Sequence, residues 1–410
     1  MSKKMKYLSL LAVVCLLFIY LFLDGGDKGL DETNPSILAN EDSSVTIPQR
    51  IESMSIDEKI GQMIFAGVSG KELNAETKQL VKNYKFGGII FNGKNFSSPS
   101  QTVAYVNGLK AVNSNNKLPL FFGIDQEGGR ISKLPGDLIE IPSNMEIGKI
   151  NDSAFSFEIG SVLGKLVNAY GFNINFAPVL DVNSNPKNPV IGDRSFGNNP
   201  SIVSELGVQT MKGIQSEKVI PTIKHFPGHG DTSVDSHLEL PIVNKSLPEL
   251  EKLELIPFYR AIDEGAEMVM IAHILLPKVD QELPSSLSKE IITGILRNKI
   301  GFDGVIITDD MTMKAITENF DIGNAAVMSV QAGSDMIMVA HDYDNIMKVF
   351  SALKKAVEQG EISEERINES VTRILTLKKK YEIADSYSKK KVDINELNQQ
   401  IESVLDKYMN

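Results

Sequence analysis

The chain has 410 residues, of which 42% are hydrophobic, so it is long enough and apolar enough to bury a large core. Its formal net charge of -11 at pH 7 provides no basic surface to neutralise phosphates, which argues against a nucleic-acid partner. The single cysteine, Cys15, lies in an N-terminal apolar segment, which excludes disulfide frameworks and thiolate zinc sites from the rest of the chain.

Residues 1–24 have the pattern of an export signal or membrane anchor. Three lysines precede an unbroken apolar run at 7–23, and this charge asymmetry keeps the lysine end in the cytoplasm. Because no convincing cleavage site follows, we expect an uncleaved anchor with the rest of the chain outside the cell; a processed secreted protein or a lipoprotein is the alternative. Residues 25–49 are rich in polar residues and are predicted to be a flexible tether.

The folded domain is predicted to cover residues 50–382. A capping box at Ser55 and Glu58 marks the start of a helix near its beginning. Short apolar runs then recur along the chain, at 62–67, 87–92, 120–125, 172–178, 220–225, 268–273, 304–309 and 336–341. Amphipathic helical stretches lie between or after them, at 100–113, 153–169, 201–216, 247–263, 287–299, 323–332, 344–358 and 363–380.

This alternation predicts an α/β fold. Strands that are apolar throughout, each followed by a helix, indicate a parallel sheet covered on its outside. Eight such strands close most simply into a single (β/α)8 barrel of the TIM type. A doubly wound open sheet is the alternative, but no Gly-rich phosphate loop follows the first strand. Residues 383–410 have helical periodicity and are predicted to form a C-terminal helical extension.

Polar residues gather where the predicted strands end. Active sites of (β/α)8 barrels lie at the carboxyl ends of the strands, so these residues are expected to share one cleft. They are Asp125, Lys224, His225, His273, Asp309 and His341.

The segment 224–237 reads KHFPGHGDTSVDSH and carries three of the five histidines in the chain. The connection that contains it, 225–247, is longer than most strand-to-helix loops, which suggests a functional lid. Asp309 is a candidate nucleophile for a covalent glycosyl-enzyme. His237, oriented by Asp235, is a candidate acid and base, since imidazole titrates near neutral pH.

These segments resemble glycoside hydrolase family 3, in its β-N-acetylglucosaminidase branch. The resemblance covers about residues 50–380 and rests on KHFPGHG followed by DSH, on FDGVIITDDM and on GIDQEGGRISKL. It implies that Asp309 is the nucleophile and that His237, assisted by Asp235, is the acid/base. It also implies a set of residues that bind the sugar: Asp125, Arg130, Arg194, Lys224 and His225.

The resemblance further implies a retaining exo-β-N-acetylglucosaminidase. The expected substrates are peptidoglycan-derived wall fragments that carry a terminal N-acetylglucosamine, and no metal or organic cofactor is expected. Because a histidine donor can permit phosphate as the acceptor, an N-acetylglucosaminide phosphorylase is an alternative. We expect a monomer whose partners are the carbohydrate substrate and, through the anchor, the membrane.

Two other functions remain open from the residues alone. The three histidines of the 224–237 segment, with Asp231 or Asp235, could ligate zinc in a zinc-dependent hydrolase, although their spacing matches no HExxH pattern. A non-catalytic sugar-binding wall protein is the other, and the presence of a nucleophile candidate argues against it. His229 is expected to hold the loop in shape, and Asp310 to be a structural hydrogen-bond acceptor.

Overall fold

The computed structural model describes residues 45–236, 238–387 and 391–409. The predicted anchor at 1–24 and most of the predicted tether lie outside these residues. Within the described ranges, no helix combines the length and the apolar character needed to cross a membrane.

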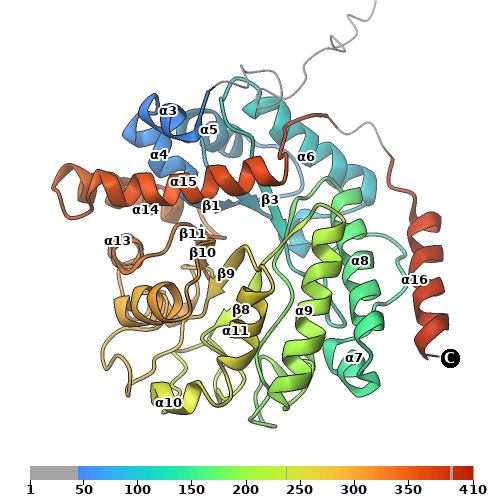
Figure 1. The fold of residues 1–410 in the computed structure, drawn as a ribbon. Helices are drawn as coiled ribbons and strands as arrows, with labels where there is room; N and C mark the ends of the chain where they lie inside the picture. Colours follow the sequence, from blue (N-terminus) through green and yellow to red (C-terminus); the bar gives the residue numbers. More distant parts are fainter. Residues whose placement is uncertain (1–44, 237, 388–390, 410) are drawn as a thin grey trace, which may run out of the picture.

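Parallel strands form two sheets at the centre of the molecule (Figure 1). One has the order β11-β1-β2-β3-β6-β7 and the other the order β10-β9-β8. The strands are β1 (Ile64–Gly67), β2 (Gly88–Ile90), β3 (Phe121–Ile124), β6 (Ile174–Asn175), β7 (Ile220–Pro221), β8 (Ile223–Phe226), β9 (Met268–Ile271), β10 (Val305–Thr308) and β11 (Ile337–Val339). Each overlaps a predicted apolar run, and β7 and β8 share one run. The prediction of an α/β fold with parallel strands is confirmed.

Single bridges connect the two sheets on both sides. Val179 pairs with Lys224 of β8, and Ile307 of β10 pairs with Met336, which immediately precedes β11. A small antiparallel hairpin, formed by β4 (Gln126–Gly128) and β5 (Ile131–Ser132), follows β3 and was not among the predicted elements.

Helices surround the strands (Figure 1). They are α3 (Ile47–Glu52), α4 (Ile56–Gln62), α5 (Ala75–Tyr84), α6 (Pro99–Asn113), α7 (Asn144–Ile150), α8 (Ser153–Ala169), α9 (Pro200–Ser216), α10 (Leu247–Leu250), α11 (Ile256–Asp263), α12 (Lys314–Thr317), α13 (Ile322–Ala332), α14 (Tyr343–Glu358), α15 (Glu364–Lys380) and α16 (Ile394–Met409), with 3₁₀ turns η1 (Gly93–Asn95) and η2 (Gly192–Arg194) and a π-helix η3 (Glu290–Lys299). The predicted capping box is present at the start of α4, where the Ser55 backbone donates to Glu58 Oε2 at 2.8 Å.

The predicted helix at 247–263 is divided into α10 and α11. Each of the two helices has a proline in its first turn, Pro248 in α10 and Pro257 in α11. Proline suits the start of a helix but lacks the N–H that the helix interior requires. Pro257 therefore begins a second helix instead of continuing the first.

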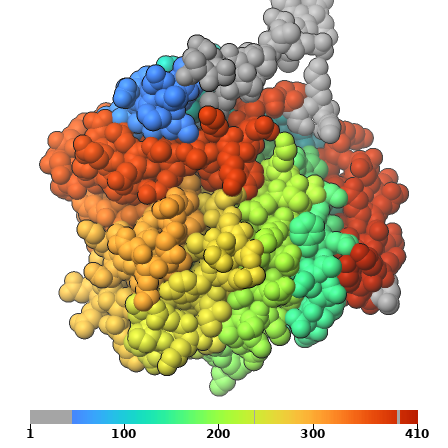
Figure 2. Space-filling model, in the orientation of Figure 1, coloured from blue at the N-terminus to red at the C-terminus, as the bar shows by residue number. Residues whose placement is uncertain are grey.

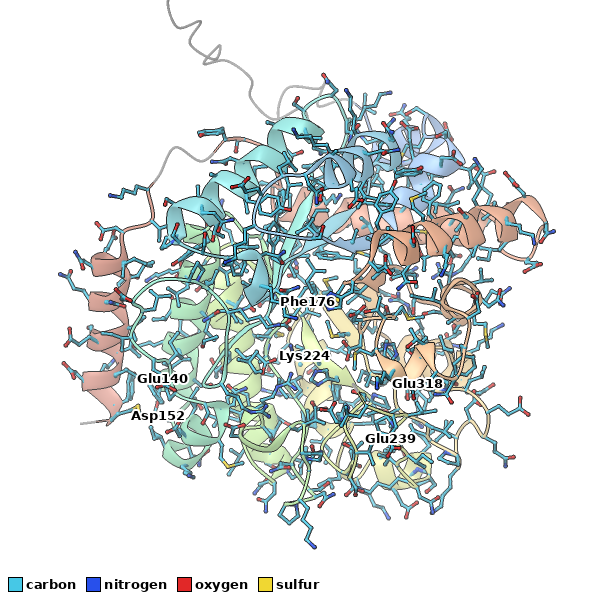
Figure 3. All side chains as sticks on the ribbon, turned by 180° about the vertical axis from the view of Figure 1, so that it is seen from behind. Glu140, Asp152, Phe176, Lys224, Glu239 and Glu318 are labelled. Carbon is cyan, nitrogen blue, oxygen red and sulfur yellow. The ribbon has the colours of Figure 1, made fainter. Side chains whose placement is uncertain are left out.

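Aromatic rings fill the interior between the strands. The rings of Phe65 and Phe176 meet edge to face, with centroids 5.5 Å apart. Gly123 of β3 leaves room for them, since a Cβ at this position would lie 2.6 Å from the Phe176 ring. Figure 3 shows Phe176 and Lys224 near the centre of the molecule. Gly123 lies two residues before Asp125 in the sequence, so this aromatic packing lies close to the end of β3.

The last helix, α16, packs against α8 on the flank of the molecule (Figures 1 and 2). Leu397 and Ile401 are buried in this contact region, and the rings of Phe155 and Tyr408 have centroids 5.0 Å apart. The helix lies within the predicted C-terminal extension.

Candidate active site

A cavity of about 240 Å³ lies at the carboxyl ends of the strands. The register of β9 and β10 pairs Ile271 with Thr308, so His273 and Asp309 leave the sheet close together. The loops after β2, β3, β6, β8 and β11 contribute the other walls. The polar residues that line the cavity are Asn92, Asp125, Glu127, Lys133, Arg194, Lys224, His225, His229, Ser236, Asp309, Asp310 and His341.

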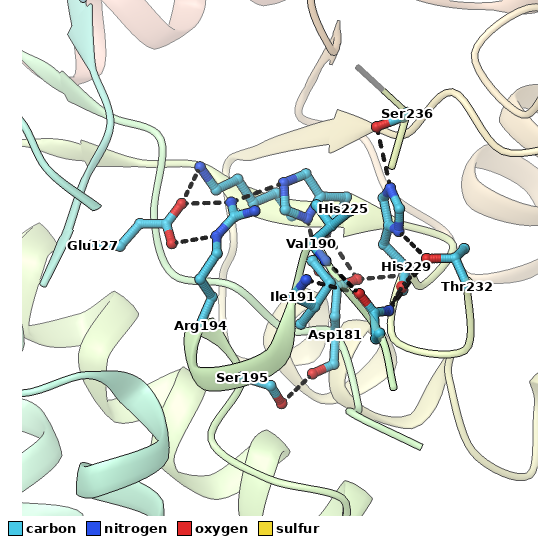
Figure 4. Close-up of polar contacts among 12 residues, drawn as sticks. Glu127, Asp181, Val190, Ile191, Arg194, Ser195, His225, His229, Thr232 and Ser236 are labelled. Carbon is cyan, nitrogen blue, oxygen red and sulfur yellow. Dashed lines mark hydrogen bonds and ion pairs between the residues drawn. The ribbon is translucent and has the colours of Figure 1, made fainter. Parts of the chain in front are cut away.

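Charged groups of alternating sign form one wall of the cavity. Lys224 Nζ lies 2.7 Å from Asp125 Oδ1 and 2.7 Å from Glu127 Oε1. Arg194 binds the Glu127 carboxylate with two hydrogen bonds, of 2.9 and 2.7 Å (Figure 4). Lys133 Nζ contacts the other oxygen of Asp125 at 2.7 Å. These groups are charge-assisted donors and acceptors held in fixed positions.

The pairing keeps these buried groups ionised. Burial on its own raises the pKa of Asp125, but Lys133 and Lys224 lower it far below its usual range. Burial likewise opposes ionisation of Glu127, and Arg194 and Lys224 nevertheless lower its pKa to about 2. A wall of ionised donors and acceptors is suited to hydrogen-bonding the hydroxyl groups of a sugar.

The sequence prediction did not include Glu127 or Lys133 in the site. Both lie in the quoted GIDQEGGRISKL segment. The spacing of Glu127 from Asp125 offers a signal, because residues two apart in an extended chain point to the same side. Lys133 is placed by the β4–β5 hairpin, which the apolar pattern does not reveal.

A buried carboxylate, Asp181, organises the start of the histidine-rich loop. Its Oδ2 lies 2.7 Å from Nδ1 of His225, and its Oδ1 accepts from the His229 backbone N–H at 2.6 Å (Figure 4). Nε2 of His225 lies 3.3 Å from Arg194 Nη2, a group that only donates. We therefore assign Nδ1 of His225 as the donor to Asp181 and Nε2 as an acceptor.

His229 stabilises the loop that contains it. Its Nδ1 lies 2.8 Å from Thr232 Oγ1, and its Nε2 lies 3.3 Å from Ser236 Oγ. Burial, reinforced by the nearby His225, lowers the pKa of His229 to about 4. The ring is thus neutral at pH 7 and both of its nitrogens are engaged, in keeping with the loop-holding role predicted for it.

Asp309 lies in the cavity immediately after β10. Its backbone N–H donates to Ile271 at 2.9 Å, and its Oδ1 accepts from the Asp310 backbone at 2.8 Å. Burial opposes ionisation, but His273, His225, the Asp310 N–H and Lys224 together hold the pKa of Asp309 below its usual value. The side chain is therefore an ionised carboxylate in a largely desolvated position.

The neighbours of Asp309 have structural contacts. His273 is fully buried, with Nδ1 2.7 Å from Ser286 Oγ and Nε2 3.1 Å from the Asp310 carbonyl oxygen. Asp310 accepts from the backbones of Thr312 and Ala340 at 3.0 and 2.9 Å. Asp310 is thus a structural acceptor, as expected.

Residues 55–377 match the Glycosyl hydrolase family 3 N terminal domain. The chain belongs to glycosyl hydrolase family 3. The resemblance found in the sequence motifs is confirmed, and with it the prediction of a glycoside hydrolase at the level of the family.

Two curated relatives and one solved structure illustrate the similarity. Beta-hexosaminidase A of Pseudoalteromonas piscicida is 34% identical over 332 residues, which are 75% of this chain and 56% of that protein. Beta-hexosaminidase of Nitrosomonas eutropha is 33% identical over 293 residues, 70% of this chain and 83% of that protein. A glycoside hydrolase family 3 beta-N-acetylglucosaminidase from Paenibacillus sp. str. FPU-7 superposes with a TM-score of 0.82 at 40% identity, over 87% of this chain and 69% of that chain. The match thus spans just over half the length of the first relative.

Not every residue implied by the family 3 resemblance lines the cavity. Arg130 is not part of the lining, and its side chain is about half exposed. Its Nε contacts Asp193 at 2.7 Å and its Nη2 donates to the Val190 carbonyl at 2.6 Å. Arg130 thus braces the loop that carries Arg194, and its predicted contact with sugar stays a prediction.

Of the candidate acid/base pair, only Asp235 is among the residues that the structure describes. His237 lies outside the described residues, so its role stays a prediction. The Asp235 carbonyl accepts from the backbones of Leu238 and Glu239, at 2.9 and 3.1 Å. Ser236 lines the same cavity as Asp309, so the residue next to His237 and the candidate nucleophile lie on one side of the molecule.

The described residues do not support the alternative of a zinc-dependent hydrolase. Among them, no group of three or more His, Cys, Asp or Glu side chains is arranged to hold a metal ion. His225 and His229 are instead paired with Asp181, Arg194, Thr232 and Ser236.

Proposed function

We propose that this family 3 chain is a retaining exo-β-N-acetylglucosaminidase. The observation that carries the proposal is the ionised Asp309 carboxylate, which shares its cavity with the charged wall of Asp125, Glu127, Arg194 and Lys224. A sugar whose hydroxyls bind that wall would bring its anomeric carbon to a nucleophile. The two hexosaminidases and the N-acetylglucosaminidase to which the chain is similar support this choice of sugar.

The proposed reaction has two steps. An oxygen of Asp309 attacks the anomeric carbon while His237, oriented by Asp235, gives its proton to the departing glycosidic oxygen. A water molecule then loses a proton to His237 and displaces Asp309, which restores the original configuration at the anomeric carbon. The sugar is held by Asp125, Arg194, Lys224 and His225, with Arg130 in support.

One assay tests the class of reaction. Purified protein is incubated with matched chromogenic β-N-acetylglucosaminide and β-glucoside, with and without a chelator and with and without inorganic phosphate. We expect N-acetylglucosamine to be released from the first substrate regardless of the chelator. Preference for the glucoside, or loss of activity with the chelator, would refute the proposal. Formation of N-acetylglucosamine 1-phosphate would identify a phosphorylase.

We also propose that the natural substrates are peptidoglycan-derived fragments and that the enzyme acts outside the cell as a monomer. The lysine-flanked apolar run of residues 1–24 supports export and anchoring. Membrane fractionation followed by protease treatment of intact cells tests this location. A protein that is protected from protease in intact cells would contradict it.

We further propose that the two sheets form one closed (β/α)8 barrel. The bridges Val179 to Lys224 and Ile307 to Met336, which join the sheets on both sides, support closure. So does the gathering of Asp125, Lys224 and Asp309 at one cavity.

A further inference from the structure

An ion pair links the beginning and the end of the long connection between β8 and α10. Lys245, near the end of the connection, places Nζ 2.9 Å from Oδ2 of Asp231, near its beginning. Lys245 also forms an ion pair with Glu254. The segment between Asp231 and Lys245 contains Asp235 and Ser236 and the predicted acid/base.

Glu254 anchors this contact in the body of the protein. It is fully buried, and a Cβ added to Gly228 would lie 2.7 Å from the Glu254 Cβ, so the start of the loop lies directly on Glu254. Burial raises the pKa of Glu254, and Lys245 opposes that effect. Lys245 thus neutralises a buried carboxylate while it binds the loop.

The connection has a first limb, which includes His229 to Thr232, and a second limb, which includes Val243 to Lys245. Each limb is hydrogen-bonded separately to the rest of the protein. Asn188 donates to the His229 carbonyl at 2.8 Å, and Asn185 donates to the Thr232 carbonyl at 3.0 Å. On the other limb, the Val243 backbone donates to Leu275 at 3.0 Å. The pair of Asp231 and Lys245 joins these two attached limbs directly across the base of the intervening segment.

We propose that Asp231, Lys245 and Glu254 form a latch that positions the Asp235–Ser236 segment against the cavity of Asp309. The inference rests on the proposed function, because it assigns the latch an effect on the acid/base carried by that segment. Asp231 and Lys245 are partly exposed, with side chains 32% and 22% accessible, and such pairs contribute little to stability. A small displacement of a catalytic group is costly to the rate, so loss of the contact between Asp231 and Lys245 should affect catalysis more than folding.

The test uses Asp231→Asn in the full chain, which removes the charge but leaves the pair of Lys245 and Glu254. We expect kcat/KM to fall about 10-fold on aryl N-acetylglucosaminides with poor leaving groups and less than about 3-fold with good ones, because only the former need a well-placed acid. Lys245→Arg should retain most of the activity. Lys299→Met, which breaks the pair of Lys299 and Glu251 at 2.7 Å, is the matched control and should change neither value.

A double substitution separates this inference from the proposed function. In a His237→Ala parent, Asp231→Asn should change kcat/KM by less than about 2-fold, because the latch acts through the acid/base. Independent, multiplicative losses would overturn the latch, as would equal losses on good and poor leaving groups with Asp231→Asn alone. If His237→Ala itself loses activity equally on both kinds of substrate, the acid/base assignment fails, and the latch fails with it.

Discussion

The Asp309 carboxylate is ionised although it is mostly removed from water. The Asp310 N–H donates to it, and His273, His225 and Lys224 help to hold its pKa below the usual value. An amide of the same shape keeps the size of the side chain but cannot form the glycosyl ester. Asp309→Asn is therefore expected to lower kcat by about 1000-fold or more while sugar binding and thermal stability persist. Steady-state kinetics and a binding titration check this, and a substantial residual rate would argue against the assignment.

A comparison of substrates with different leaving groups should reveal the role of His237. His237→Ala removes the proposed proton donor, so we expect a loss of about 100-fold or more in kcat/KM for substrates with poor leaving groups. Substrates whose leaving groups need little protonation should be affected far less. A plot of log kcat/KM against leaving-group pKa should accordingly be steeper for the variant. Parallel plots for the variant and the parent would contradict the proposal.

His229 should make stability depend on pH. Its folded-state pKa of about 4 lies below the ordinary histidine value of 6.5, so the unfolded chain binds a proton first as the pH falls. Stability is therefore lost as the pH decreases from about 6.5 to about 4, and at pH 5 this one group contributes a loss of about 2 kcal/mol. Urea unfolding at pH 7 and pH 5 should show a smaller decrease for His229→Gln than for the parent. Equal decreases would show that His229 does not cause the effect.

The sequence predicts the site residues at the strand ends but not the residues that hydrogen-bond to them. Asp125, Lys224 and Asp309 could be predicted because parallel strands bring their carboxyl ends together. Asp181 could not, because its contact with His225 joins residues 44 positions apart and depends on the course of an irregular loop. Arg130 was included with the site because of its motif, whereas its side chain contacts the neighbouring loop at Asp193.

Among the secondary-structure elements, β3 illustrates how tightly the strands are packed. A methyl group at Gly123 would approach the rings of Phe176 and Phe65, at 2.6 and 2.9 Å. Overpacking of this kind costs about 1–3 kcal/mol, so Gly123→Ala should lower the free energy of unfolding by that amount. Gly93→Ala is the control, since nothing lies within 4 Å of a Cβ at that position. Denaturant titration of both variants gives the comparison, and equal stabilities would refute the packing argument.

The strand runs could be predicted with little error because continuous burial leaves a continuous apolar pattern. Helix interruptions are harder to predict from periodicity alone. The predicted 247–263 helix matched the amphipathic pattern, but Pro257 starts a separate helix there. The β4–β5 hairpin was missed because its strands are very short and contain a single apolar side chain, Ile131.

Across the whole molecule, Asp335 connects helix α15 to the parallel strands. This fully buried carboxylate accepts from the Ile306 backbone at 2.9 Å and from Ser370 Oγ at 3.0 Å, and it pairs with Arg297 and with Arg373 of α15. Removing it takes away the buried carboxylate that pairs with these partly buried arginines, so Asp335→Ala should destabilise the protein by about 3–5 kcal/mol.

Asp303, which is exposed and lies just before β10, provides the control for that substitution. Asp303→Ala should leave the free energy of unfolding nearly unchanged, as surface substitutions usually do. Urea unfolding of both variants at pH 7 makes the comparison. If Asp335→Ala is no less stable than Asp303→Ala, the buried pairing is not a structural link.

The charged wall of the cavity affects how any mutational survey of this protein should be read. Lys224 lies between Asp125 and Glu127, and Glu127 in turn binds Arg194. Deleting any one of them leaves its neighbours with uncompensated charge. The free-energy changes of the single deletions therefore overlap and cannot be added. Alanine scanning would therefore exaggerate the contribution of every member. Only paired exchanges, in which a cation and its carboxylate are replaced together, can divide the affinity for sugar among these side chains.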